Sequence, residues 1–272
     1  MNVPSIFQGG DEFVAALMKP DGSIGIPAGD KGINLRARGF VPHEAEFDEL
    51  CAALAVVGKT SLLPCESTLV TNDHRAVWGW TSQLLLMRPY WAPGALAQED
   101  ERLIRLAAGA ALQNRPEELG YLSFPMIEVA LKRALSTQVS IDGTALVDLK
   151  VRGRRPKIDA KQRVYIAQLL GLFLDAQPSR AGLQAVAYLL DRVDQIEASN
   201  GGAIWTIANW RNGSLHGSRC FGGVGCAMFS LALLINLSNC RGHFEAWRDE
   251  QLERLRRHPG EPIPPSEFYR IS

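Results

Sequence analysis

The sequence predicts a mainly α-helical protein that begins with a small mixed α/β region. Two observations lead to this fold class. Apolar residues recur at helical spacing through most of the chain beyond about residue 95, whereas residues 1–43 are rich in glycine, proline and aspartate, which favour turns. The chain has 272 residues, of which 46% are hydrophobic and 21% charged, as in an ordinary folded protein.

The N-terminal portion gives a mixed prediction. Residues 23–27 suit a short strand between turns, and residues 44–57 place their apolar side chains on one helical face. Residues 68–91 are rich in threonine, valine and tryptophan, so both a strand and a buried helix remain open. The Tyr90–Gly94 segment, with its proline and glycine, is the predicted boundary to the helical remainder.

The rest of the chain is expected to be a helical bundle. Ser123 followed by Pro125 is typical of a helix start, and Asp159 is expected to cap another. The predicted helices span residues 99–113, 123–138, 159–176, 179–198, 203–210, 222–239 and 244–257.

Three parts follow from this pattern. We expect an N-terminal accessory or sensing region at 1–95, a helical domain at 96–245, and a C-terminal helix with a proline-rich tail at 246–272.

A compact polar segment lies between two of the predicted helices. It reads Trp210-Arg211-Asn212-Gly213-Ser214-Leu215-His216-Gly217. Arginine can hold a phosphate by a bidentate fork, and histidine can give or take a proton near neutral pH. The combination of Arg211 with His216 indicates chemistry on a phosphodiester.

The spacing Arg-Asn-x-x-x-His between helices resembles the signature of HEPN domains, the helical ribonuclease-like domains of toxin and antiviral defence systems. Arg211, Asn212 and His216 match the signature, and the resemblance covers about residues 100–245. It implies a HEPN-like helical bundle and a cytoplasmic, metal-independent endoribonuclease of toxin or antiphage type. The ribose 2′-hydroxyl would attack the adjacent phosphorus and leave a 2′,3′-cyclic phosphate.

In this chemistry His216 would move protons and Arg211 would stabilise the added negative charge, while Asn212 would hold the turn or a phosphate oxygen. The resemblance also implies a homodimer with two copies of the motif across one groove, and an antitoxin or sensor protein as a further partner. The glycine run 222–225 and the helix after it are the expected dimer contact, because small residues let helices approach closely.

Other interpretations of the motif remain. Arg211 and Asn212 could simply bind the last carbonyls of a helix. The same fold could bind RNA, a nucleotide or a protein without cleaving RNA, or it could serve as an oligomeric scaffold. Catalysis requires Arg211 and His216 to be accessible and to converge, in one chain or across a dimer, whereas a scaffold would bury or separate them. Glu128 could line the groove, but an ion pair with Lys132 four residues later is favoured.

One strongly basic run, Lys150–Arg163, provides a second candidate for RNA contact. Its proposed phosphate-binding residues are Arg152, Arg154, Arg155 and Lys157. A solvated loop that only aids solubility explains the run equally well.

Charge and cysteine content narrow the function further. The chain has 29 basic and 29 acidic residues, so any site for a polyanion must be local. The five cysteines have no metal-like spacing, and reduced thiols in a cytosolic protein are expected. No metal or other cofactor is expected, and neither a signal peptide nor a membrane span is predicted.

Overall fold

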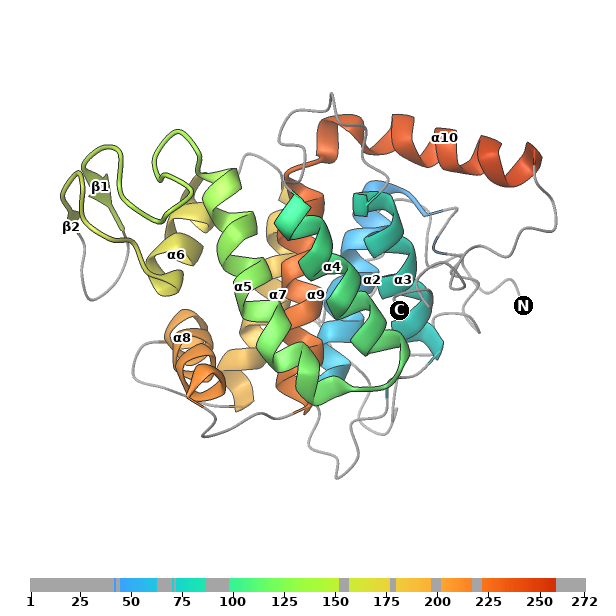
Figure 1. Ribbon diagram of the computed structural model, residues 1–272, viewed down its shortest axis with the longest axis horizontal. Coiled ribbons are helices and arrows are strands. Elements are labelled where there is room, and N and C mark those ends of the chain that lie inside the picture. The colour runs from blue at the N-terminus through green and yellow to red at the C-terminus, as the bar shows by residue number, and fades with distance from the viewer. Residues whose placement is uncertain are drawn as a thin grey trace, which may run out of the picture.

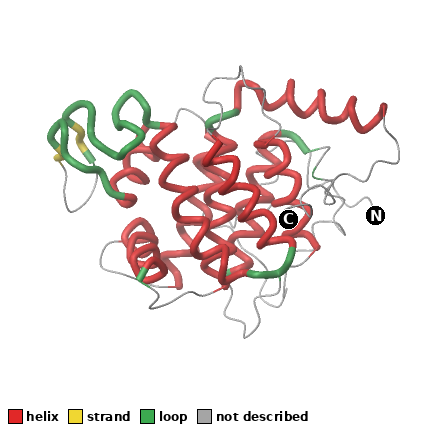
Figure 2. Tube along the Cα trace, viewed as in Figure 1, coloured by secondary structure: helices red, strands yellow, loops and turns green. Residues whose placement is uncertain are grey.

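Helices form most of the described chain, which confirms the mainly α-helical prediction (Figures 1 and 2). The computed structural model describes residues 42, 45–62, 70, 72–86, 98–151, 157–176, 180–196, 202–216 and 222–257. Within these ranges the elements are α2 (Phe47–Ser61), α3 (Asn72–Leu86), α4 (Gln98–Leu112), α5 (Pro116–Ala134), β1 (Leu149–Lys150), β2 (Lys157–Ile158), α6 (Ile166–Ala176), α7 (Arg180–Ile196), α8 (Gly202–Leu215), α9 (Gly222–Ser238), the 3₁₀ turn η2 (Arg241–His243) and α10 (Phe244–Arg257).

Helix α9 is the centre of the bundle, where it packs against α2, α3, α5 and α7 (Figure 1). Every residue from Val224 to Leu237 is buried. Gly225 permits the contact with α5, because a Cβ built there would lie 2.4 Å from the Pro116 carbonyl oxygen. The expected close helix approach is therefore confirmed, but it occurs inside one chain. The expectation that α9 forms a dimer contact surface is wrong, since its side chains are already covered.

Helices α2 and α3 belong to the same hydrophobic core as the later helices, so the core is continuous across residue 95. The open choice for residues 68–91 is decided in favour of a buried helix, α3. Its Trp78 is buried, and the indole Nε1 donates a hydrogen bond to Ser230 Oγ on α9 at 2.8 Å. The strand expected at 23–27 lies outside the described residues.

Helix α5 begins earlier than predicted, at Pro116 rather than Ser123. Pro116 occupies the first turn, where its missing N–H is not needed, and Glu117 and Glu118 suit the positive end of the helix. Ser123 and Pro125 lie inside the helix instead of starting it. The prediction chose the wrong one of two proline-containing start signals.

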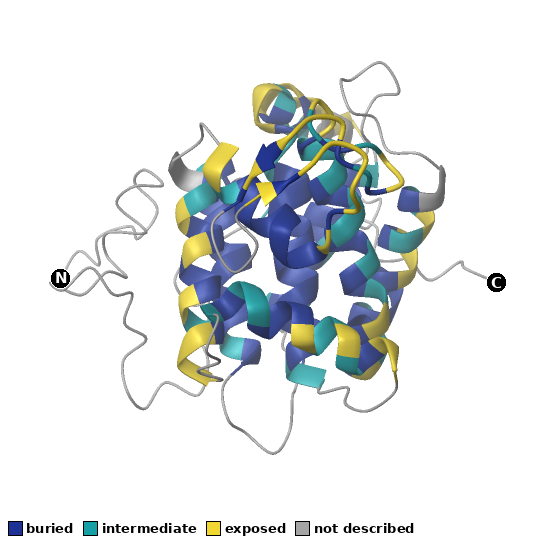
Figure 3. Cartoon of the chain, turned by 90° about the vertical axis from the view of Figure 1, so that its left-hand side faces the viewer, coloured by how far each residue is buried: buried dark blue, intermediate teal, exposed yellow. Residues whose placement is uncertain are grey.

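Helix α6 begins later than predicted, at Ile166, so Asp159 does not cap it. The residues between them pair with an earlier loop: Lys161 N–H donates to the Ala145 carbonyl and Ala145 N–H donates to the Gln162 carbonyl, both at 2.8 Å. Together with the antiparallel β1–β2 hairpin, these bonds form a lobe with much exposed surface (Figure 3). Long-range backbone pairing thus overrides the local helical pattern.

The C-terminal helix α10 spans Phe244–Arg257, as predicted. It is fixed at its start, where the Phe244 ring meets the Phe47 ring of α2 edge to face at 5.4 Å. Among the described helices, none alone has the length and apolar character to cross a membrane; the pair Gly222–Ser238 and Arg241–Glu250, bent by 65°, meets that criterion only together.

Candidate functional site

The motif lies in the last turns of α8, which continues through Leu215 (Figure 1). The prediction that the helix ends at Trp210 and that a turn begins at Arg211 is wrong. Asn212 remains in the helical ladder, because its carbonyl accepts a hydrogen bond from the backbone N–H of His216 at 3.1 Å. Gly213 is tolerated inside the helix, and the neighbouring Ser214 is buried. Residues 217–221 lie outside the described chain.

Helical geometry separates the two residues proposed for chemistry. At about 100° per residue, Arg211 and His216 project about 140° apart around α8. Asn212 and His216 are four residues apart and share one side, and both are exposed. A single α8 therefore presents an amide and an imidazole together, with the guanidinium on a neighbouring face.

Arg211 is held against α5. Its Nε donates a hydrogen bond to Glu128 Oε1 at 2.8 Å, and its Nη1 donates to Asn212 Oδ1 at 3.3 Å. The Arg211 side chain is 33% exposed and that of Glu128 23% exposed. The prediction that Glu128 pairs with Lys132 is wrong. The Glu128 carboxylate instead accepts the hydrogen bond from Arg211 on α8.

The Arg211–Glu128 pair also provides an opposite charge for the single charged residue of α8. Arg211 is the only charged residue of α8 in the sequence, and the rest of the helix is apolar or uncharged. A partly buried cation is stabilised by an opposite charge nearby. A lone arginine at a helix surface needs no counter-ion, so nothing in the sequence identified Glu128 as the partner of Arg211.

The basic run is only partly within the described structure. Arg152, Arg154 and Arg155 lie outside the described residues. Lys157 is exposed on β2 and forms an ion pair with Asp159 at 2.9 Å. The hydrogen bond to Asp159 raises the pKa of Lys157. Phosphate binding by the run stays a prediction.

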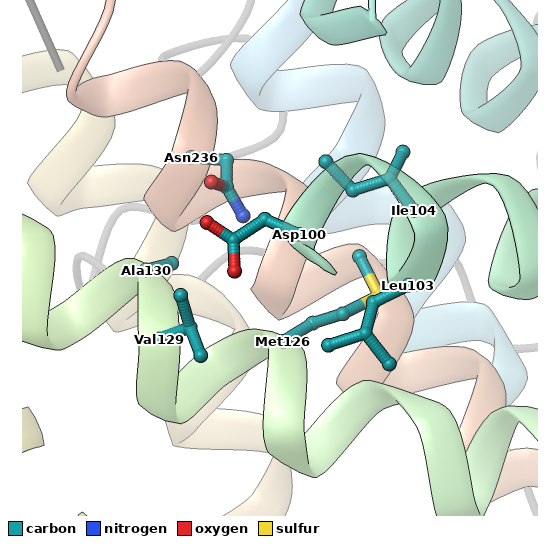
Figure 4. Close-up of a pocket in the computed structure, with 7 residues that line it drawn as sticks. All are labelled: Asp100, Leu103, Ile104, Met126, Val129, Ala130 and Asn236. Carbon is teal, nitrogen blue, oxygen red and sulfur yellow. The ribbon is translucent and has the colours of Figure 1, made fainter. Parts of the chain in front are cut away.

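A small cavity between α4, α5 and α9 is too small for a substrate. Its volume is about 10 Å³, roughly enough for one water molecule. The lining residues, drawn in Figure 4, are Asp100, Leu103, Ile104, Met126, Val129, Ala130 and Asn236. Asp100 also forms an ion pair with Arg133. The cavity is therefore a packing feature of the bundle.

Other chemically active residue types do not form a second centre within the described ranges. No group of three or more His, Cys, Asp or Glu residues there is arranged to hold a metal ion. His74 is buried, and this burial lowers its pKa to about 4. Burial raises the pKa of Cys226 to about 12, so its thiol is not a nucleophile at neutral pH.

Comparisons with protein-family models, with curated proteins and with solved structures found no match to the chain.

Proposed function

We propose that the protein is a metal-independent endoribonuclease of toxin or antiphage-defence type, acting in the cytoplasm. The observation that carries this proposal is the end of α8, where an exposed His216 and Asn212 adjoin a partly exposed Arg211 fixed by α5. A helix that packs against its neighbours can hold these three side chains in a constant geometry, and catalysis depends on such positioning of the reacting groups.

The residues divide the chemistry between them. His216 takes the proton from the ribose 2′-hydroxyl, whose oxygen forms a new bond to phosphorus as the bond to the 5′-oxygen breaks. A protonated imidazole returns a proton to that leaving oxygen. Arg211 stabilises the negative charge on the phosphoryl oxygens. The products are a 2′,3′-cyclic phosphate and a free 5′-hydroxyl.

The separation of Arg211 and His216 around α8 favours a site made by two chains. In a homodimer related by a two-fold axis, the guanidinium of one chain can lie beside the imidazole of the other. Exposed Leu215, within the motif and directly before His216, gives an apolar contact that such an interface would cover. An antitoxin or sensor protein would then act by blocking or forming this interface.

The main experiment is an RNA-cleavage assay in the presence of a chelator. His216→Ala should abolish cleavage, and Arg211→Ala should lower it about 100-fold or more, because each removes a group needed in the transition state. Asn209→Ala is the matched control, since Asn209 is an exposed polar residue on the side of α8 that also carries Asn212. Cleavage that requires added divalent metal would contradict the mechanism.

Mixing the two inactive variants tests the two-chain site. In a mixed dimer of Arg211→Ala and His216→Ala chains, one of the two shared sites is intact. The mixture should therefore recover roughly a quarter of wild-type activity after subunit exchange, because about half of the dimers are mixed. No recovery, with exchange verified by mass, would place the whole site in one chain.

A non-catalytic binding module is the second candidate, and one observation favours it. Glu128 balances the charge of Arg211 at 2.8 Å, and the imidazole projects elsewhere. Such an arrangement suits recognition of RNA, a nucleotide or a partner protein through hydrogen bonds. Tight RNA binding without any cleavage, unchanged in His216→Ala, would establish this function instead.

A further inference from the structure

We infer that Glu128 is a positioning residue, which holds the Arg211 guanidinium so that its terminal nitrogens face the phosphate; this inference rests on the proposed function of the same site. Arginine has a long side chain with several rotatable bonds, and it loses conformational entropy when it is fixed on a ligand. A group that fixes it beforehand removes much of that cost from the binding step.

The hydrogen bonds to the Arg211 guanidinium use only part of its N–H donors, which suits a positioning role. Glu128 accepts from Nε, the nitrogen nearest the aliphatic chain, at 2.8 Å. Asn212 accepts one hydrogen bond from Nη1 at 3.3 Å. The guanidinium has five N–H donors, so two partners leave the remaining donors of Nη1 and Nη2 for an anion. The head group is thus held by two side chains while its terminal edge stays available.

The carboxylate itself stands on a rigid support. Glu128 lies in the middle of α5 beside Ile127, which is fully buried, and α5 packs against the central helix α9 through Gly225. Arg211 stands on α8, which also contacts α5. Two packed helices therefore fix both ends of the ion pair, so the orientation of the guanidinium is a property of the fold.

An opposite role for Glu128, as an inhibitory latch that neutralises Arg211, predicts a different geometry and a different sign. A latch would span the two terminal nitrogens, which bind carboxylates and phosphates most strongly. The bond to Nε leaves those nitrogens accessible. If Glu128 only neutralised the cation, its removal would strengthen anion binding; if it positions the guanidinium, its removal weakens anion binding.

Steady-state cleavage of an RNA oligonucleotide by the full chain distinguishes the two roles. Glu128→Met keeps the size and removes both the charge and the hydrogen-bond acceptor, and should lower kcat about tenfold with little change in KM, because orientation matters most as charge develops. Glu118→Met is the matched control, since Glu118 lies on the same helix in an exposed ion pair with Arg115 at 2.7 Å. Equal or higher kcat in Glu128→Met would overturn the inference.

A second readout does not depend on catalysis. In ¹⁵N NMR spectra of arginine side chains, the Arg211 Nε–H signal, assigned with Arg211→Lys, should be protected from solvent exchange in the wild type and lose that protection in Glu128→Met. Titration with inorganic phosphate should shift the wild-type signal at a lower concentration than the variant's. If wild type cleaves no RNA, the proposed ribonuclease function fails, and the phosphate titration alone decides the positioning role. Equal or tighter phosphate binding by Glu128→Met would refute it.

Discussion

Helices α8 and α9 are neighbours in sequence, yet they lie in different environments. Helix α9 has no charged residue and α8 has one, and neither shows a clear apolar stripe in its sequence. Helix α9 is enclosed by α2, α3, α5 and α7, whereas α8 lies at the edge of the bundle against α5, α6 and α7 (Figure 1). Neither helix has an amphipathic period that fixes which of its faces is covered, so the contacts with neighbouring helices decide that α9 lies in the core and α8 at the edge.

The largest effect should come from filling the space that α9 leaves for α5. In Gly225→Ala the new Cβ would lie 2.4 Å from the Pro116 oxygen and 2.6 Å from the Gly120 nitrogen, both backbone atoms that cannot rotate away. The two helices must separate, so we expect a loss of about 4 kcal/mol in the free energy of unfolding. Chemical denaturation measures it.

Gly109→Ala on α4 is the control for that prediction. No atom lies within 4 Å of a Cβ at Gly109, so alanine should raise stability by about 0.5–1 kcal/mol through helix propensity. A Gly225→Ala protein as stable as the wild type would mean that α5 and α9 do not pack as described.

The second effect is a pH dependence that originates in the core. Burial lowers the pKa of His74 from 6.5 to about 4, and His74 Nε2 lies 3.2 Å from Ser61 Oγ and 3.1 Å from the Val57 carbonyl oxygen. Between pH 6.5 and 4 the unfolded chain binds the proton and the folded chain does not. The stabilisation is therefore full above pH 6.5 and falls as the pH drops, by about 3 kcal/mol at pH 4.

Denaturant titrations of wild type and His74→Gln at several pH values isolate this contribution from the carboxylates. Glutamine retains a polar group near the Nε2 position but does not titrate, so the difference between the two proteins should shrink steadily as the pH falls. A constant difference across the window would show that His74 is not buried in its neutral form.

The smallest effect should come from the motif itself. The Arg211–Glu128 pair is partly exposed, and pairs of this kind contribute about 1 kcal/mol or less. A double-mutant cycle with Arg211→Ala and Glu128→Ala should therefore give a coupling energy below about 1 kcal/mol, and His216→Ala should change stability by less than about 0.5 kcal/mol. A larger loss in any of these variants would mean that the motif supports the fold and would favour the scaffold interpretation.

The sequence by itself determined the helical class and several elements. Apolar spacing located α2, α4, α7 and α10 to within a few residues, because their apolar residues recur at helical spacing. The glycine run at the start of α9 correctly indicated a close helix approach. The sequence also identified Arg211, Asn212 and His216 as candidate site residues from the chemistry of their side chains, and their function stays a prediction.

Tertiary structure decided the rest. The start of α6 depended on backbone bonds to residues 143–145, which no local pattern encodes. Whether α9 faced a partner or its own chain depended on α5 and α2. The partner of Arg211 came from Glu128, 83 residues earlier in the chain. Each outcome rests on contacts between distant segments, whose geometry is set by packing the whole bundle and not by the residues on either side.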